Sequence, residues 1–157
     1  MRMMAAGLAI VAIAAPAAVQ QPGVDDPRGF VARTYASYAR AANAGPEEPT
    51  YAYSARLRAL AAGYARAWGG GDLVGPLDFD LWTNAQEWEI SVPALDVADE
   101  APDRRTITAR FSNYGRETVN RFRFVREGGR WYLDDIVNGS GAGDEGWTFS
   151  AMLAERP

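Results

Sequence analysis

Apolar residues recur every three or four positions in two segments of the first half of the chain, which is the spacing of an amphipathic helix. The first segment begins where Asp26 precedes a proline, and it predicts a helix over 27–42. The second begins at Ser54, whose hydroxyl can cap a helix, and its apolar stripe runs to Trp68. Glycines at 69–71 end this second helix, and the proline-containing segment 43–49 between the two is expected to be a loop.

Beyond residue 85 the pattern changes to alternation of apolar and polar residues, which is typical of strands with one buried face. In the first such stretch, Trp88, Ile90 and Val92 are predicted to share the buried face. Short turn segments link the later stretches, so we expect neighbouring strands to pair antiparallel. Strands are predicted at 86–92, 106–112, 121–124 and 131–133, with turns at 113–116 and 128–129.

The closing segment returns to helical spacing, because Phe149, Met152 and Leu153 lie on one side of a short helix within 147–155. Helices followed by a run of strands indicate an α+β fold. We expect N-terminal helices packed on an antiparallel sheet of about four strands, with a short C-terminal helix. This length of chain fits one domain, which we place at 27–157.

The first residues carry the pattern of an export signal. Arg2 supplies a positive charge, residues 3–15 are small or apolar, and Ala17 ends a short run of the small residues that a signal peptidase requires. The apolar run falls short of the roughly 20 residues that span a bilayer as a helix, so cleavage is favoured over a retained inner-membrane tether. We therefore predict a periplasmic or secreted protein without stable membrane insertion. It has a signal peptide at 1–17 and a flexible linker at 18–26.

The amino-acid composition limits the kinds of site that this chain can form. The 157 residues include no cysteine and no histidine, which excludes disulfides, thiolate metal sites, a cysteine nucleophile and the usual general base near neutral pH. All 16 basic residues are arginines, and they face 20 acidic residues for a net charge of −4. An acidic chain repels phosphate backbones, so nucleic acid is not an expected partner, and no cofactor or metal is expected.

Two motifs carry a resemblance to a known family. One is the Asp-Phe-Asp sequence at 78–80 that leads into Asn-Ala-Gln-Glu at 84–87, and the other is the segment Gly-Gly-Arg-Trp-Tyr-Leu-Asp-Asp-Ile at 128–136. From about residue 27 onward the chain resembles the bacterial envelope proteins classed as domain of unknown function 3828, which are similar to nuclear-transport-factor-like and cystatin-like folds. The resemblance implies a curved antiparallel sheet wrapped around helices with a conical cavity, and it implies no activity. Glu87 stands where that family usually carries Asp.

The same motifs hold a group of carboxylates that could bind a cation. Oxygen ligands suit calcium, but the spacing lacks the regular calcium-binding loop. We favour a structural role, in which Asp side chains accept backbone N–H groups of a turn and the acidic pair near the end receives an arginine. The carboxylates are Asp78, Asp80, Glu87, Asp134 and Asp135.

Aromatic side chains form a second candidate site. They could line a cavity between helices and sheet and stack a ring-shaped ligand, although core packing is the favoured interpretation. If the cavity were catalytic, Asp80 or Asp134 with a raised pKa could move a proton with the help of a tyrosine hydroxyl. The aromatic residues are Tyr35, Tyr38, Tyr64, Trp68, Trp82 and Trp88.

Arginines form the third candidate site, since Arg110 lies on one predicted strand and Arg121 and Arg123 on the next. A solvated sheet face is the favoured interpretation, and the functional one is an anionic wall polymer, a lipid headgroup or an acidic protein as partner. Arg104, Arg105 and Arg126 lie at the ends of these strands.

The leading functional hypothesis is an exported, non-enzymatic binding or interaction module of the cell envelope. One alternative is a small cavity enzyme that uses a buried Asp and a Tyr for proton transfer. The other is an inhibitor of an envelope enzyme that presents the loop 139–146. The residues predicted to bind a ligand are Tyr38, Tyr64, Trp68, Asp80, Trp82, Trp88, Arg121, Arg123 and Asp134.

Overall fold

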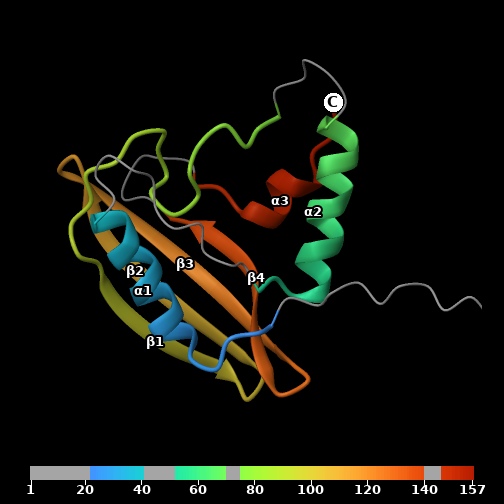
Figure 1. Cartoon of the computed structure of the whole chain (residues 1–157), viewed down its shortest axis with the longest axis horizontal. Coiled ribbons are helices and arrows are strands. Elements are labelled where there is room, and N and C mark those ends of the chain that lie inside the picture. Colours follow the sequence, from blue (N-terminus) through green and yellow to red (C-terminus); the bar gives the residue numbers. More distant parts are fainter. Residues whose placement is uncertain (1–21, 41–51, 70–74, 140–145) are drawn as a thin grey trace, which may run out of the picture.

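The computed structural model describes residues 22–40, 52–69, 75–139 and 146–157. In this part of the chain, three helices and one four-stranded antiparallel open sheet form an α+β fold with a short C-terminal helix, as predicted (Figure 1). The predicted signal peptide and loop 43–49 lie outside the described residues. The elements are α1 (Pro27–Arg40), α2 (Ala55–Trp68), β1 (Ala94–Ala101), β2 (Arg104–Asn113), β3 (Arg116–Glu127), β4 (Arg130–Asn138) and α3 (Phe149–Ala154).

Each strand pairs with the next one along the chain, so the sheet order is β1-β2-β3-β4. The turns between β2 and β3 and between β3 and β4 each contain two residues, both with positive φ, which is the backbone geometry of a tight hairpin. The register places Ile107 opposite Phe122, and Phe122 opposite Ile136, so that these three buried side chains share one face. Three of the four predicted strands and both predicted turns are therefore confirmed.

The remaining predicted strand, 86–92, is wrong. This segment forms only an isolated bridge between Ile90 and Asn113, and Val92, which we expected on the buried face, is 85% exposed. Pro93 follows it and has no N–H to donate to a ladder. The first strand is instead β1, where Asp96 and Asp99 interrupt the apolar alternation and pair across the sheet with arginines of β2.

Helix α1 lies over β1 and β2 on one face of the sheet (Figure 1). Its buried residues Val31, Tyr35 and Tyr38 belong to the same core cluster as Phe111 and Phe122 of the sheet. The recurrence of apolar residues every three or four positions, which predicted this helix, aligns these side chains on a single face. The helix begins at Pro27, as predicted, and residues 41 and 42 of the predicted helix lie outside the described residues.

Helix α2 is capped by Ser54, whose hydroxyl accepts the N–H of Leu57 at 3.1 Å, as predicted. We expected its ring-bearing side to pack on the sheet, but α2 stands beside β4 and packs against α3 (Figure 1). Only Leu57 of this helix is fully buried. The reason is that residues 52–54 extend along β4, where the Ser54 N–H donates to the Leu133 C=O at 2.9 Å, so α2 starts at the rim of the sheet.

The described part of the predicted linker is held against β4. Val24 and Trp131 exchange two backbone hydrogen bonds, of 2.8 and 3.0 Å. Among the described helices, none combines the length and the apolar character that a membrane crossing requires.

Candidate functional site

The aromatic residues of the second candidate site fall into two groups. Tyr35, Tyr38 and Trp82 are each at most 2% exposed and belong to the core cluster under α1. Half-buried Trp88 meets Tyr38 edge-on, with ring centroids 5.4 Å apart.

The other two rings, Tyr64 and Trp68, lie on α2, where they pack on one another with centroids 6.0 Å apart. The Trp68 indole donates to the Glu155 C=O at 3.2 Å, beyond the end of α3. The structure therefore brings Tyr38, Asp80, Trp82 and Trp88 together. Tyr64 and Trp68 lie on α2, where Tyr64 packs against the edge of the core cluster.

The Asp80 carboxylate holds a turn, as predicted. Its Oδ1 accepts the N–H groups of Trp82 and Thr83, both at 2.9 Å, and its Oδ2 accepts the Tyr38 hydroxyl at 2.6 Å. The Asp80 N–H in turn donates to the Ala85 C=O at 3.0 Å, which closes the turn. Asp80 and Tyr38 are the kind of pair that proton transfer requires, but here one carboxylate oxygen is taken up by the backbone of its own turn and the other by the Tyr38 hydroxyl.

A second buried network centres on Asn120, which we did not predict. Its side-chain N–H groups reach the Trp82 C=O at 2.9 Å and the Leu81 C=O at 3.2 Å, and its Oδ1 accepts an N–H of Asn138 at 2.8 Å. The Tyr35 hydroxyl donates to the same Trp82 C=O at 2.9 Å. Burial raises the pKa of the Tyr35 phenol, which stays protonated as a donor. The alternating pattern could have identified this buried residue, because Asn120 lies two residues before Phe122 and therefore on the same inward face of the strand.

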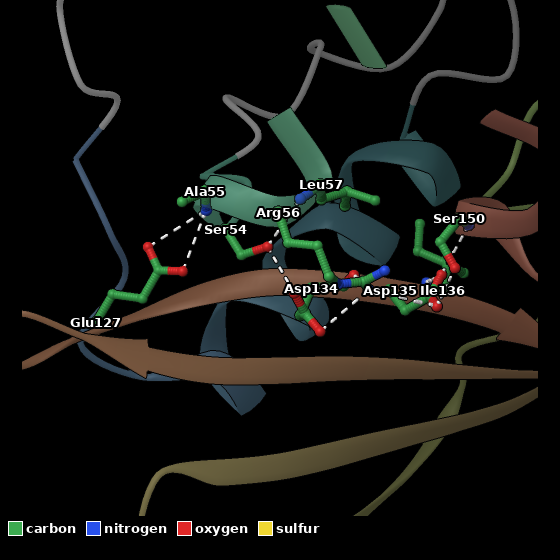
Figure 2. A network of polar contacts seen from close by, with 9 residues as sticks. All are labelled: Ser54, Ala55, Arg56, Leu57, Glu127, Asp134, Asp135, Ile136 and Ser150. Atoms are coloured by element: carbon green, nitrogen blue, oxygen red, sulfur yellow. Dashed lines mark hydrogen bonds and ion pairs between the residues drawn. The ribbon is translucent and has the colours of Figure 1, made fainter. Parts of the chain in front are cut away.

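A third network joins α2 to β4 (Figure 2). The Arg56 guanidinium donates two hydrogen bonds, both of 3.1 Å, to the Asp134 carboxylate. The Ser54 hydroxyl donates to the same carboxylate at 2.6 Å. Asp135 accepts both the N–H and the hydroxyl of Ser150, at 3.0 and 2.6 Å, which anchors the start of α3. The predicted arginine partner of the acidic pair is therefore Arg56, which lies 3.7 Å from Asp135.

The electrostatics of Asp134 differ from the raised pKa that a proton-transfer site needs. Burial opposes ionisation of its carboxyl, but hydrogen bonds from Arg56 and Ser54, together with the charges of Arg56 and Arg104, outweigh burial and lower its pKa. Asp134 is therefore ionised near neutral pH. Within the described residues, no group of three His, Cys, Asp or Glu side chains is arranged to hold a metal ion.

A hollow of about 360 Å³ opens beside this network, and it is the strongest candidate for a ligand site. Its charged and polar lining includes Arg56, Glu100, Arg104, Thr106, Arg123 and Asp134, and Phe124 and Val125 add apolar surface. Arg104 lies opposite Val125, and Thr106 lies opposite Arg123. Arg104 and Arg123 are therefore diagonal neighbours on one face of the sheet, with backbones roughly 7–8 Å apart.

The arginines around this hollow differ in their partners. Arg56 is paired with Asp134, and Arg105 turns to Asp99 and to the Trp131 ring, 5.0 Å away. In contrast, the guanidinium groups of Arg104 and Arg123 form no hydrogen bond or ion pair with another described residue.

The other predicted arginines lie elsewhere. Arg110 pairs with Asp96 across the β1–β2 ladder. Arg121 packs against Gly139, and Arg126 faces the Trp131 ring at 5.8 Å. Of the two arginines predicted to bind a ligand, the structure thus places Arg123 in the hollow. Asp134, another residue predicted to bind a ligand, lines the same hollow, and so does Arg56, which was not predicted.

Comparisons with models of protein families, with curated proteins and with solved structures find no match to this chain.

Proposed function

We propose that this protein is an exported, non-enzymatic binding module of the cell envelope, and that it takes an anionic ligand in the hollow lined by Arg104 and Arg123. The observation that carries the proposal is the pair of guanidinium groups on one sheet face, neither of which forms a hydrogen bond or ion pair with another described residue. Guanidinium groups form strong, often bidentate hydrogen bonds with carboxylates and phosphates.

The charges of the hollow favour an anion between these two residues. Arg104 and Arg123 repel one another as diagonal neighbours, and a bound anion would relieve that repulsion. The carboxylates nearby are already engaged, since Asp134 binds Arg56 and Glu100 accepts the Thr106 hydroxyl at 2.7 Å. The site therefore keeps a positive surplus within a chain of net charge −4.

The apolar lining adds to this preference. Phe124 and Val125 border the hollow, and low-polarity walls strengthen the attraction between an arginine and an anion. The acidic remainder of the chain disfavours contact with anionic groups outside the hollow, so the ligand chemistry that fits is a single phosphate or carboxylate group, either free or carried by a larger molecule.

The setting we propose for this module is the periplasm or the extracellular space, after removal of residues 1–17. The resemblance to the exported family of domain of unknown function 3828, and the cone-shaped, nuclear-transport-factor-like fold that it implies, are part of the same proposal. The observed order of helices followed by an antiparallel meander supports it. Wall polymers and lipid headgroups are the anionic components that such a protein would meet.

The test replaces both arginines in the full chain and measures binding by calorimetry at low salt. The probes are inorganic phosphate, glycerol 1-phosphate as a headgroup fragment, and an oligogalacturonate as a carboxylate polymer. We expect the wild type to bind at least one probe, and Arg104→Gln with Arg123→Gln to weaken that binding about tenfold or more. Which probe binds distinguishes a phosphate source from a carboxylate source.

The matched control is Arg28→Gln with Arg33→Gln, which removes the same charge from exposed positions on α1. It should change affinity less than about twofold if the site is local. An equal loss in both double variants, or no binding of any probe by the wild type, would overturn the proposal.

A further inference from the structure

A second hollow, of about 340 Å³, lies at the other end of the sheet. It is formed where the turn at 83–87 meets the β2–β3 hairpin, and Asn84, Glu87, Tyr114, Arg116 and Thr118 contribute to its lining. The register separates the two sites: Arg104 pairs at one end of the β2–β3 ladder, and Asn113 with Arg116 at the opposite end. The second hollow is therefore independent of the arginine site.

Tyr114 is in an unfavourable position in two respects. Its φ is 47°, in the left-handed region where the first residue of such a hairpin turn favours Asn, Asp or Gly. Its side chain is also 62% exposed, so it gains little from burial. Neither the turn nor the core explains a tyrosine here.

Asn84, which also lines the hollow, likewise has a backbone φ in the left-handed region. Its φ is 55°, and Asn84 and Tyr114 are the non-glycine residues with positive φ in the described part of the chain. The Asn84 side-chain oxygen accepts the Trp147 indole N–H at 2.6 Å, which fixes the amide and leaves its N–H₂ group without a partner among the described residues. Strained backbone gathers at binding sites, and the strained Tyr114 lines this hollow together with Asn84.

The lining suits a ligand rich in hydroxyl groups. It offers an amide, a carboxylate from Glu87, a guanidinium from Arg116 and a hydroxyl from Thr118, and the two charges are of opposite sign. Sugar hydroxyls both donate and accept hydrogen bonds, and the C–H face of a sugar ring can stack on the face of an aromatic ring. We propose that this hollow binds a neutral saccharide, with Tyr114 as the stacking platform and Asn84 and Glu87 as hydroxyl partners.

The test titrates cellotetraose, maltotetraose and tetra-N-acetylchitotetraose into the full chain, with calorimetry and tyrosine NMR signals as readouts. At least one of these neutral oligosaccharides binds. Tyr114→Phe keeps the ring and holds the affinity within about threefold, whereas Tyr114→Asn loses the ring and weakens binding about tenfold or more. Glu87→Gln also weakens binding, because an ionised acceptor is replaced by a neutral one.

The melting temperature separates a binding role from a structural one. Tyr114→Asn should raise it, because Asn tolerates the left-handed turn position better than Tyr. The Arg104→Gln, Arg123→Gln variant should leave saccharide affinity unchanged, which keeps this proposal distinct from the anion site. The proposal is overturned if none of the three oligosaccharides binds at millimolar concentration, or if Tyr114→Asn binds as tightly as the wild type.

Discussion

The indole of Trp82 stacks on the ring of Phe122, with centroids 4.4 Å apart and planes inclined by 28°. This contact joins the turn at 80–85, which is neither helix nor strand, to the middle of β3. Phe30 and Tyr35 of α1 meet the same indole edge-on, at 6.0 and 5.4 Å. The centre of the core is therefore supplied by an irregular segment that helix and sheet enclose.

Trp82→Ala should be among the most damaging substitutions in the chain. It empties a fully buried position and removes three ring contacts, so we expect the free energy of unfolding to fall by about 3–5 kcal/mol. Urea denaturation followed by far-ultraviolet circular dichroism measures the loss. Trp82→Phe should lose less, and a loss below about 1 kcal/mol for Trp82→Ala would show that the turn does not dock in solution.

Asp80→Ala tests whether this carboxylate serves the turn. It leaves the N–H groups of Trp82 and Thr83 without their acceptor, which should lower the free energy of unfolding by about 2 kcal/mol. Tyr38→Phe removes the hydrogen bond to Asp80 and should lower the free energy of unfolding by about 1 kcal/mol. The control is Asp78→Ala, an exposed neighbour, where we expect a change within about 0.5 kcal/mol. Equal effects at Asp78 and Asp80 would contradict the assignment.

Asn120 and Tyr35 share the Trp82 carbonyl, which allows a graded comparison. Tyr35→Phe leaves that carbonyl bonded to Asn120 and should lower the free energy of unfolding by only about 1 kcal/mol. Asn120→Ala leaves a cavity and several buried groups without partners, and should lower it by about 3 kcal/mol. Thermal unfolding of both variants measures the order, and a reversed order would show that the network is centred on Tyr35 instead.

The Arg56–Asp134 pair makes part of the stability depend on pH. The folded protein lowers the pKa of Asp134, so the unfolded chain takes up a proton first as the pH falls. The stabilisation that this pair provides is therefore complete above the ordinary carboxyl pKa of about 4. It is lost as the pH drops through the lower pKa that Asp134 has in the folded protein. Arg56→Gln should lower the free energy of unfolding by about 1 kcal/mol at pH 7, since both side chains are partly exposed. The gap between variant and wild type should narrow at pH 3; a gap that stays constant would mean that packing, not charge, connects the two residues.

The elements that local sequence encodes were predictable. Ser54 predicts the start of α2 because a capping side chain bonds only to the first turn of its own helix. Gly128 predicts a hairpin because the geometry of a tight turn depends only on its two central residues. β1 escaped prediction because Asp96 and Asp99 suit a strand only when arginines of β2 face them. Arg105 lies 6 residues from Asp99, and Arg110 lies 14 residues from Asp96, so this neutralisation is apparent only once the pairing register of β1 and β2 is known.

The candidate sites show the same limit. Arg123 could be named from the sequence because it is a charge within an alternating strand, and Asp134 because it belongs to an acidic pair that directly follows a predicted strand. Arg56 could not, because its role depends on α2 standing at the rim of β4, 78 residues further along the chain. Likewise, the apolar stripe of α2 predicted burial without revealing that this helix would contact α3 more extensively than the sheet.

The order of the strands along the sheet is also their order along the chain, and this has a kinetic consequence. Pairing between consecutive segments closes only short loops, so the meander can assemble step by step from β1 to β4. Helix α1 is synthesised before the sheet, and its Tyr35 can pack against Phe111 and Phe122 only after those strands have been made. We therefore expect the hairpins to form before α1 docks, so that this helix packs onto a sheet whose strands are already paired.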